Sequence, residues 1–324
     1  VLSTDGAYRY LGQIGLFFDA RGILTGYEAG SRPLPVDDRS LADLGVEAAG
    51  PAMELERRVR AALEPLSVEV ARSSVYFDGD RENVRNRQTN LGDLSADAIA
   101  WVARREAARG GPSPAFALRN GGGIRSSIGG VDHETSRRRG GPIRLLDIEA
   151  ALRFDNPIVL VTTTHLALKE TLEAGLRGVG TARGHFPQVS AEVFLAYDPA
   201  GTEQIQEPQT GPGAVLQPGG RVRTLRVGEV EIVRDGALLT PAATITFATL
   251  DYLARGGDGW FPTVAPIAGA KPVADGAGVM SEQSALRAYL GHLVASGTWR
   301  EGLAYVDPAP DRPDTFTRIR PLAQ

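Results

Sequence analysis

Arginines that stand beside glycines are the residues of this sequence best suited to chemistry, because they could hold a phosphate. The segment GDRENVRNRQTNLGDL, residues 79–94, carries Arg81 and Arg85 ahead of a predicted helix. The segment RNGGGIRSS, residues 119–127, places Arg125 after three glycines. Glycines let the backbone approach a ligand closely, and a guanidinium group binds two phosphate oxygens at once. Together the segments could form an anion pocket, although a plain glycine turn with solvated arginines explains the pattern equally well.

A carboxylate and two aromatic residues form a second group of candidates. In TLDYLARGGDGWFP, residues 249–262, Asp258 stands among glycines and could accept hydrogen bonds from two sugar hydroxyls. The alternative is an aspartate that serves its own turn backbone, which an isolated GGDG segment does more often. Phe154, in ALRFDNPIVLV, and Tyr252 would suit the two sides of a flat ring, although each by itself is more often a core residue.

The composition is that of a globular chain without a general affinity for polyanions. Of its 324 residues, 42% are hydrophobic and 23% are charged, which are ordinary globular values. The formal net charge of −4 argues against a nucleic-acid-binding protein, so any phosphate site must be local. The absence of cysteine excludes disulfides, thiolate nucleophiles and cysteine-bound metals. The sequence contains no run of about 18 apolar residues, the pattern that would predict a membrane span.

The first 65 residues predict a hairpin and a helix outside the main domain. The sequence opens at Val1 rather than at methionine, without a signal-peptide pattern, and we expect the natural N-terminus to lie upstream. Alternating apolar residues on both sides of a DARG turn, within 7–26, predict a β-hairpin. Residues with helical spacing follow a proline-containing connector. The predicted units are a hairpin fragment 1–38, a linker helix 39–65 and a main domain 66–324.

The main domain alternates strand and helix patterns. Apolar and β-branched runs predict strands at 66–77, 114–118, 157–163, 189–197, 220–234 and 243–249. Helical spacing predicts helices at 92–109, 146–152, 165–176 and 281–297. Glycine and proline predict exposed loops at 205–219 and 268–279. Because helices separate some strands and short turns separate others, we predict an α/β (α+β) fold, with a mixed sheet and packed helices.

These segments, in this order, resemble the C-terminal domain of the bacterial periplasmic 5′-nucleotidase / UDP-sugar hydrolase family and its animal ecto-5′-nucleotidase relatives. The resemblance spans residues 66–300. It is carried by GDRENVRNRQTNLGDL, NGGGIR, RFDN in place of the usual PFGN, GHFPQVS at 184–190, and DYLARGGDGW. The opening YRYLGQIGLFFDARG looks like the last hairpin of the family's N-terminal metallophosphoesterase domain. The resemblance therefore implies a hairpin left over from that domain, a linker helix and a substrate-binding domain.

The resemblance also implies three groups of substrate-binding residues. The phosphate would face Arg81, Arg85 and Arg125, with help from Asn120. The ribose would be held by Asn156, the backbone of Gly184 and Asp258. The base would stack between Phe154 and Tyr252. Tyr252 departs from the usual phenylalanine, so we expect base binding to persist with an altered preference. Asp155, where the motif has glycine, is a second departure and bears on the geometry of that loop.

Hydrolysis in this family occurs at two divalent metals held by His, Asp and Asn of the N-terminal domain. None of the histidines here lies in the matching metal motifs, and we interpret His133, His165, His185 and His292 as packing or surface residues, although His185 lies beside the predicted ribose loop. We therefore expect no catalytic residue and no metal ligand in this chain. The two metal ions are expected in the absent N-terminal domain, and the chain alone should bind without turnover.

The predicted function is that of the nucleotide-binding domain of a 5′-nucleotidase-type phosphohydrolase. Its substrates would be nucleoside 5′-monophosphates, with UDP-sugars and nucleoside di- or triphosphates as further candidates. Three alternatives stay open: a 2′,3′-cyclic nucleotide phosphodiesterase/3′-nucleotidase, the thiosulfate-processing enzyme of sulfur oxidation, and a binding-only nucleotide receptor. The implied partners are the nucleotide and the chain's own metallophosphoesterase domain, and the implied location is periplasmic or extracellular.

Overall fold

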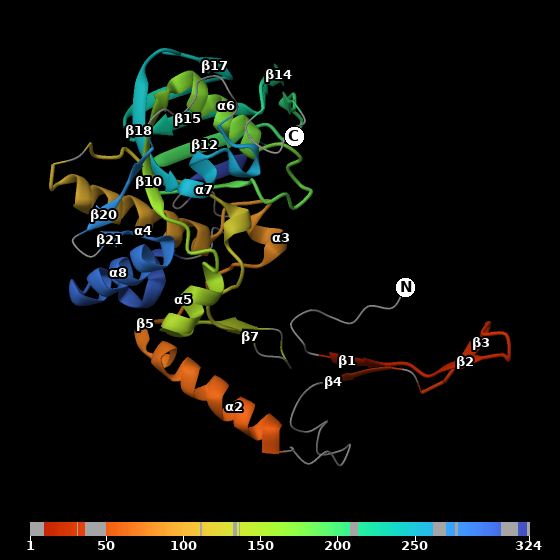
Figure 1. Ribbon diagram of the computed structural model, residues 1–324. Helices are drawn as coiled ribbons and strands as arrows, with labels where there is room; N and C mark the ends of the chain where they lie inside the picture. Colours follow the sequence, from red (N-terminus) through yellow and green to blue (C-terminus); the bar gives the residue numbers. More distant parts are fainter. Residues whose placement is uncertain are drawn as a thin grey trace. The chain divides into compact units, whose positions relative to one another are not determined.

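The computed structural model divides into two compact units, residues 1–65 and residues 66–324 (Figure 1). The first residues of the predicted hairpin, 7–9, and of the predicted linker helix, 39–49, lie outside the described residues. The structure describes residues 10–30, 32–35, 50–110, 112–131, 135, 137–207, 213–261, 270–275, 278–305 and 317–322.

Unit 1 contains two antiparallel strand pairs and a helix. β1 (Tyr10–Gln13) pairs with β4 (Arg32–Pro35), and β2 (Leu16–Phe18) pairs with β3 (Leu24–Tyr27). The helix α2 (Gly50–Leu63) is the part of the predicted linker helix that the structure describes. The hairpin thus forms around the turn where the sequence predicts it.

The turn between β2 and β3 is closed by a single carboxylate. Asp19 Oδ1 accepts hydrogen bonds from the backbone N–H groups of Arg21 and Ile23 at 2.8 and 2.9 Å. Gly22 has φ +75, the left-handed region that glycine adopts without strain. The strands beside this turn carry exposed large apolar side chains, which are Leu16, Phe17, Phe18, Leu24 and Tyr27.

Two sheets form the framework of unit 2. In the three-stranded sheet, the central β10 (Ile158–Thr164) pairs antiparallel with β18 (Thr244–Leu250) and β19 (Lys271–Pro272). The first four residues of β10 are buried in succession, because both of its faces are covered. The five-stranded sheet has the order β17 (Ala237–Leu238), β16 (Val230–Arg234), β15 (Val222–Val227), β12 (Val193–Tyr197) and β22 (Ile319–Pro321), with only β12 and β22 parallel.

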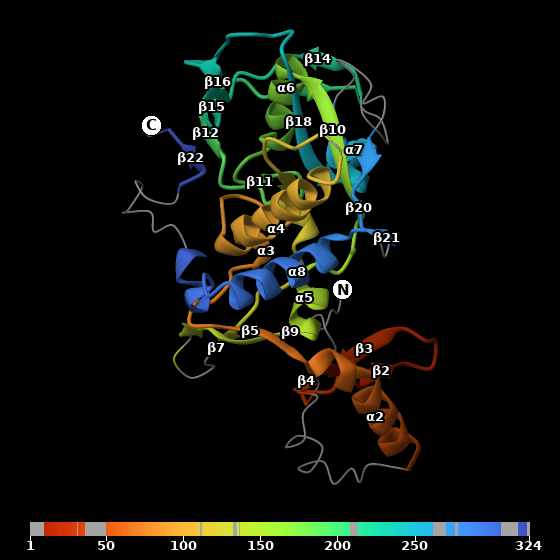
Figure 2. The ribbon, with the colours of Figure 1, turned by 90° about the vertical axis from the view of Figure 1, so that its left-hand side faces the viewer.

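The helix α4 (Asn90–Ala107) takes part in both hydrophobic cores of unit 2. Thr89 caps its first turn with a side-chain hydrogen bond to a backbone N–H. Ile99 belongs to the core formed with β10, β12 and β18. Leu94 belongs to the second core, which includes residues of α8 (Glu282–Ala295). Figures 1 and 2 both show α4 and α8 side by side. This central helix therefore links the two halves of the unit.

Shorter elements complete the unit. The helix α6 (His165–Gly175) packs against β10, β15 and β17, and α5 (Leu145–Ala151) packs against α8. The remaining strand pairs are β5 (Glu69–Ser73) with β9 (Gly141–Arg144), β6 (Leu118–Asn120) with β11 (Pro187–Val189), β7 (Gly130–Val131) with β8 (Arg138–Arg139), β13 (Ile205–Gln206) with β14 (Val215–Gln217), and β20 (Ala274–Asp275) with β21 (Gly278–Val279). The short helical turns are η1 (Glu64–Ser67), α3 (Arg81–Val84), η2 (Gly121–Gly123), α7 (Asp251–Ala254), η3 (Gly257–Gly259) and η4 (Arg300–Tyr305).

The predicted mixed α/β fold is confirmed, but four segments differ from the prediction. The described part of the loop predicted at 268–279 contains β19, β20 and β21. The strand predicted at 189–197 is divided between β11 and β12, because the chain turns at Ser190 and enters another sheet. The strand predicted at 220–234 is the β15–β16 hairpin, which turns at Gly228 with φ +56. The loop predicted at 205–219 contains the β13–β14 pair. In the two predicted strands alternating apolar residues continue across a turn, so periodicity hides it, whereas in the loops glycine and proline mask the short strands.

Candidate functional site

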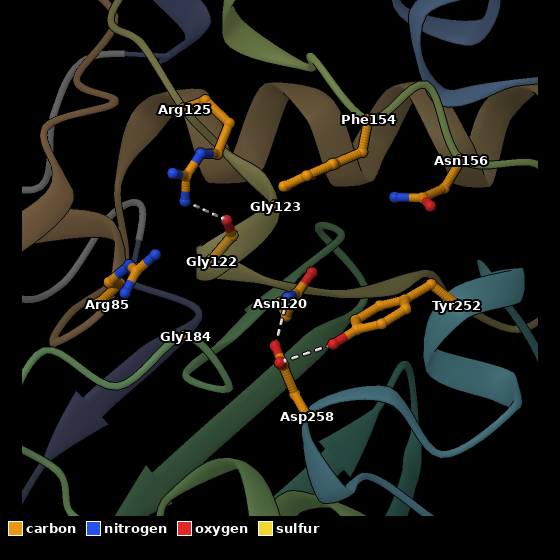
Figure 3. Close-up of a pocket in the computed structure, with 10 residues that line it drawn as sticks. All are labelled: Arg85, Asn120, Gly122, Gly123, Arg125, Phe154, Asn156, Gly184, Tyr252 and Asp258. Atoms are coloured by element: carbon orange, nitrogen blue, oxygen red, sulfur yellow. Dashed lines mark hydrogen bonds between the residues drawn. The ribbon is translucent and has the colours of Figure 1, made fainter. Parts of the chain in front are cut away.

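A hollow of about 400 Å³ lies in unit 2, within the size range of small-molecule sites (Figure 3). Its walls come from segments far apart in the sequence, which the fold brings to one place. The residues that line it are Arg85, Asn120, Gly122, Gly123, Arg125, Phe154, Asn156, Gly184, Tyr252 and Asp258. The hollow therefore gathers eight of the nine predicted substrate-binding residues, all except Arg81.

The three glycines of η2 allow close packing behind the hollow. A Cβ added to Gly121 would lie 1.8 Å from Val84 O, and one added to Gly122 would lie 2.7 Å from Gly184 O. Backbone N–H of Gly122 donates to the same carbonyl of Gly184 at 2.7 Å. Since a side chain at either position would collide with backbone, these glycines do more than turn the chain. They seat the end of β6 against α3 and the Gly184 loop.

Arg85 and Arg125 form what we call the cationic end of the pocket. Arg85 is half-buried, and its Nε has no hydrogen-bond partner among the described residues. Burial lowers the pKa of Arg85, and the positive charges of Arg81 and Arg125 lower it further. Arg125 is exposed, donates to Gly122 O at 3.2 Å, and lies 5.6 Å from the Phe154 ring centroid. Within the described residues no ion pair neutralises either arginine, so this end suits an anion.

Asp258 supplies a fixed carboxylate on another wall of the pocket. Its Oδ2 accepts a hydrogen bond from Asn120 Nδ2 at 2.6 Å, and its Oδ1 accepts one from the Tyr252 hydroxyl at 3.0 Å. These donors are side chains, so the carboxylate does not serve the backbone of its own turn. Asp258 has φ +58, which aspartate tolerates, and Arg177 Nη2 holds its carbonyl at 3.2 Å. The carboxylate is therefore oriented in advance.

Asn156 lines the hollow beside Phe154 (Figure 3), and we call Asp258 and Asn156 together the acceptor end. Asn156 donates to Glu282 Oε1 through its backbone N and its Nδ2, each at 3.0 Å. The preceding Asp155 has φ +49, in the left-handed region of the backbone. Glycine adopts this region without strain, and aspartate tolerates it better than most other residues. The departure from the family motif thus leaves Phe154 and Asn156 both lining the pocket.

Phe154 and Tyr252 are aromatic rings with free surface. They are 57% and 44% exposed, unlike the buried aromatic residues of the two cores. Figure 3 shows them on opposite sides of the hollow. The Tyr252 ring is held against Gly257, where an added Cβ would lie 2.5 Å from it. Exposed rings that border a hollow can stack on a planar ligand.

The three described histidines contact neighbouring protein groups. His185 Nε2 donates to Arg177 O at 2.6 Å, and burial lowers the pKa of His185. His165 bonds to a threonine hydroxyl, His292 stacks on a tryptophan ring, and His133 lies outside the described residues. No group of three or more His, Asp or Glu side chains that could hold a metal ion occurs in the part of the chain that the structure describes. The described residues therefore do not fit the dimetal centre that the family resemblance implies.

Three differences separate the predicted set from the observed pocket. Arg81 is exposed at the start of α3 and does not line the hollow. Gly122 and Gly123 line it, although the sequence predicted only that they permit close approach. A buried ion pair, Arg119–Glu282 at 3.0 Å, supports Asn156 and was missed. An arginine within the apolar run ALRN was the available signal, because a buried charge requires a partner.

Comparison with known proteins identifies the type of domain. Residues 69–266 match the family described as 5′-nucleotidase, C-terminal domain. The trifunctional nucleotide phosphoesterase protein YfkN of Bacillus subtilis (strain 168) is 29% identical over 255 residues, covering 78% of this chain and 15% of the relative. The snake venom 5′-nucleotidase of Gloydius brevicauda is 26% identical over 254 residues, covering 78% of this chain and 38% of the relative.

A solved structure supports the fold. The 5′-nucleotidase precursor from Thermus thermophilus superposes with a TM-score of 0.62 at 23% identity, covering 98% of this chain and 50% of that one. The chain thus spans half or less of the length of each of these three proteins.

Proposed function

The chain belongs to the family of 5′-nucleotidase C-terminal domains, and we propose that it is the nucleotide-binding domain of a 5′-nucleotidase-type phosphohydrolase. The observation that carries the proposal is the grouping of unpaired arginines, fixed acceptors and exposed aromatic rings around one hollow of about 400 Å³. A nucleoside 5′-monophosphate has a phosphate anion for the arginines, ribose hydroxyl donors for the acceptors and a flat base for the aromatic rings. UDP-sugars and nucleoside di- or triphosphates extend this substrate class.

Each part of the nucleotide has a proposed set of contacts. The phosphate lies at the cationic end, with Arg81 beside it and Asn120 assisting. The ribose hydroxyls meet Asp258 and Asn156 near the Gly184 backbone. The base stacks between Phe154 and Tyr252. Charge-assisted hydrogen bonds to a phosphate and stacking on both faces of a base are each strong enough to matter for affinity.

We propose that hydrolysis depends on a neighbouring metallophosphoesterase domain with two divalent metal ions. In this scheme residues 1–38 form the last hairpin of that domain, residues 39–65 form the linker and residues 66–324 bind the substrate. The exposed apolar side chains of the β2–β3 hairpin support this assignment, since a strand pair of this kind normally packs within a larger sheet domain. The N-terminal domain is accordingly the proposed protein partner.

The proposed location is periplasmic or extracellular. Its support is the family itself, which includes a relative named as a venom 5′-nucleotidase. In the described part of the chain, no helix combines the length and the apolar character needed to cross a membrane.

Calorimetry with AMP, adenosine and inorganic phosphate tests the proposed function. AMP should bind more tightly than either of its parts, and the chain by itself should release no phosphate from AMP when manganese, cobalt or zinc is added. Equal affinities for AMP and adenosine would contradict a phosphate contact. Including 2′,3′-cyclic AMP in the series tests the cyclic phosphodiesterase alternative.

A further inference from the structure

A fully buried ion pair lies next to the acceptor end of the pocket. Arg119 on β6 and Glu282, the first residue of α8, approach to 3.0 Å with neither side chain exposed. The Nε, Nη1 and Nη2 atoms of Arg119 form no hydrogen bond with the described residues. A pair of this kind gives little net stability, because desolvation of both charges offsets their attraction. The role of the Arg119–Glu282 pair is therefore better explained by the residue that Glu282 holds in place.

Glu282 binds Asn156 at three points. Its Oε1 accepts from the backbone N and from the Nδ2 of Asn156, and its own N–H donates to Asn156 O, all at 3.0 Å. Its Oε2 faces Arg119. Burial raises the pKa of Glu282, and the charge of Arg119 opposes that rise. Because Oε1 is hydrogen-bonded to Asn156 and Oε2 lies in an ion pair with Arg119, rotation of the carboxylate would weaken both contacts.

The contact through Nδ2 determines which atom of Asn156 a ligand meets. A side-chain amide has a donor nitrogen and an acceptor oxygen, and flipping it would set Oδ1 against Glu282 Oε1, two acceptors in contact. Asn156 Oδ1 has no hydrogen-bond partner among the described residues, so it is the amide atom left to accept from a ligand. The acceptor end thus offers an amide oxygen and the Asp258 carboxylate to the ligand.

We propose that Glu282, held by Arg119, is a positioning residue that locks the Asn156 amide and makes the acceptor end select hydroxyl groups as donors. The proposal rests on the proposed function, in which these hydroxyls are those of a ribose. Fluorine in place of a hydroxyl is of similar size but donates no hydrogen bond. Fluorine facing a locked Asn156 Oδ1 is unfavourable, because both atoms are acceptors. If the Asn156 amide is free to flip, it can turn its Nδ2 toward the fluorine.

The test measures the affinity for AMP relative to its 2′-fluoro and 3′-fluoro analogues by calorimetry. Wild type should favour AMP by about tenfold over at least one analogue. Glu282→Gln should reduce this ratio about fivefold or more, because glutamine turns its one acceptor oxygen toward the charge of Arg119 and its amide nitrogen then faces Asn156. If the unpaired Arg119 prevents that variant from folding, the double variant R119M/E282M replaces the pair with apolar side chains of similar volume and should reduce the ratio equally.

A matched control distinguishes positioning from a general loss of a buried charge. Glu173 accepts hydrogen bonds from two backbone N–H groups and pairs with Lys169 at 2.9 Å, outside the pocket. Glu173→Gln should keep the wild-type ratio. In a double-mutant cycle with Asn156→Ala, the Glu282 substitution should have no further effect on the ratio, since it acts through that amide.

The possible outcomes separate this proposal from the proposed function. AMP binding with no preference over either fluoro analogue overturns the proposal and leaves nucleotide binding intact. Additive effects of the Glu282 and Asn156 substitutions also overturn it, because Glu282 would then act by another route. Failure of the wild-type chain to bind AMP refutes the proposed function, and the proposal fails with it.

Discussion

The two ends of the pocket are organised in opposite ways. At the cationic end, Arg85 and Arg125 lie near each other without a carboxylate ion-pair partner among the described residues, and burial together with like charge lowers the pKa of Arg85. At the acceptor end, Asp258 accepts from two side chains and Asn156 is bound to Glu282. One end is completed by an anion, whereas the side chains of the other are already held in place by hydrogen bonds. We therefore expect affinity to come mainly from the first and orientation mainly from the second.

Arg125→Ala should have the largest effect on binding. Loss of a charge-assisted pair, worth about 1.5–3 kcal/mol, weakens AMP binding by about 10- to 100-fold and leaves adenosine binding nearly unchanged. The melting temperature should not fall, because the substitution removes a like charge. Arg234→Ala is the control, since Arg234 does not line the pocket and pairs with Glu231. Calorimetry that gave equal losses for AMP and adenosine would end the distinction between the two ends.

Asp258→Asn should affect both ligands and the fold. Asparagine tolerates the left-handed backbone, so the turn should persist. AMP and adenosine should both bind about tenfold more weakly, and the free energy of unfolding should fall by about 1 kcal/mol, because Asn120 and Tyr252 lose a charged acceptor. Phosphate affinity should not fall, because the substitution removes a negative charge that acts on Arg85. Calorimetry with the three ligands and urea unfolding check this, and a variant more stable than wild type would contradict a satisfied acceptor end.

Tyr252→Ala should have a smaller effect that is shared by different bases. Stacking on one exposed ring contributes about 1 kcal/mol at the lower end, so AMP, GMP and UMP should each bind about fivefold more weakly. Tyr252→Phe keeps the ring and removes the hydrogen bond to Asp258, and we expect a change of about twofold. Affinities for the three nucleotides measured side by side check this. A loss confined to one base would indicate edge recognition instead of stacking.

The sequence predicted the residues that line the pocket better than the buried residues that hold them in place. Arg125, Phe154 and Asp258 lie in short motifs whose residue types indicate the groups that they could bind, and all three line one hollow. The Arg119–Glu282 pair joins distant segments, and Glu282 alone resembles any acidic residue in the first turn of a helix. Pairings of that type depend on tertiary packing, which periodicity does not contain.

The same limit explains the misplaced elements. The β22 strand, near the C-terminal end of the chain, is an edge strand of the five-stranded sheet, and no local sequence pattern predicted it. Arg81 and Arg85 have spacing suited to one helical face, but α3 ends at Val84. Arg85 therefore leaves the helix and lines the hollow, whereas Arg81 stays at the surface. Helical spacing predicts a common face only where the helix continues.

The smallest expected effect is a pH dependence of stability that arises behind the acceptor end. His185 donates to Arg177 O, and Arg177 in turn holds the carbonyl of Asp258. Burial lowers the pKa of His185 below its ordinary 6.5, with the charges of Arg177 and Arg183 lowering it further and that of Asp258 opposing them. The unfolded chain therefore takes up the proton first as the pH falls, and it is stabilised relative to the folded chain.

His185→Gln should remove this contribution. The stability associated with neutral His185 is complete above about pH 6.5 and is lost as the pH falls toward the folded-state pKa, with a slope of at most about 1.4 kcal/mol per pH unit. Glutamine can still donate to Arg177 O but does not titrate. The free energy of unfolding, measured in urea at about pH 7.5 and about pH 5.5, should therefore change less in the variant than in wild type. His165, whose pKa burial also lowers, titrates in both proteins and cancels in the comparison. Identical pH profiles would mean that His185 becomes charged in the folded state as readily as in the unfolded chain.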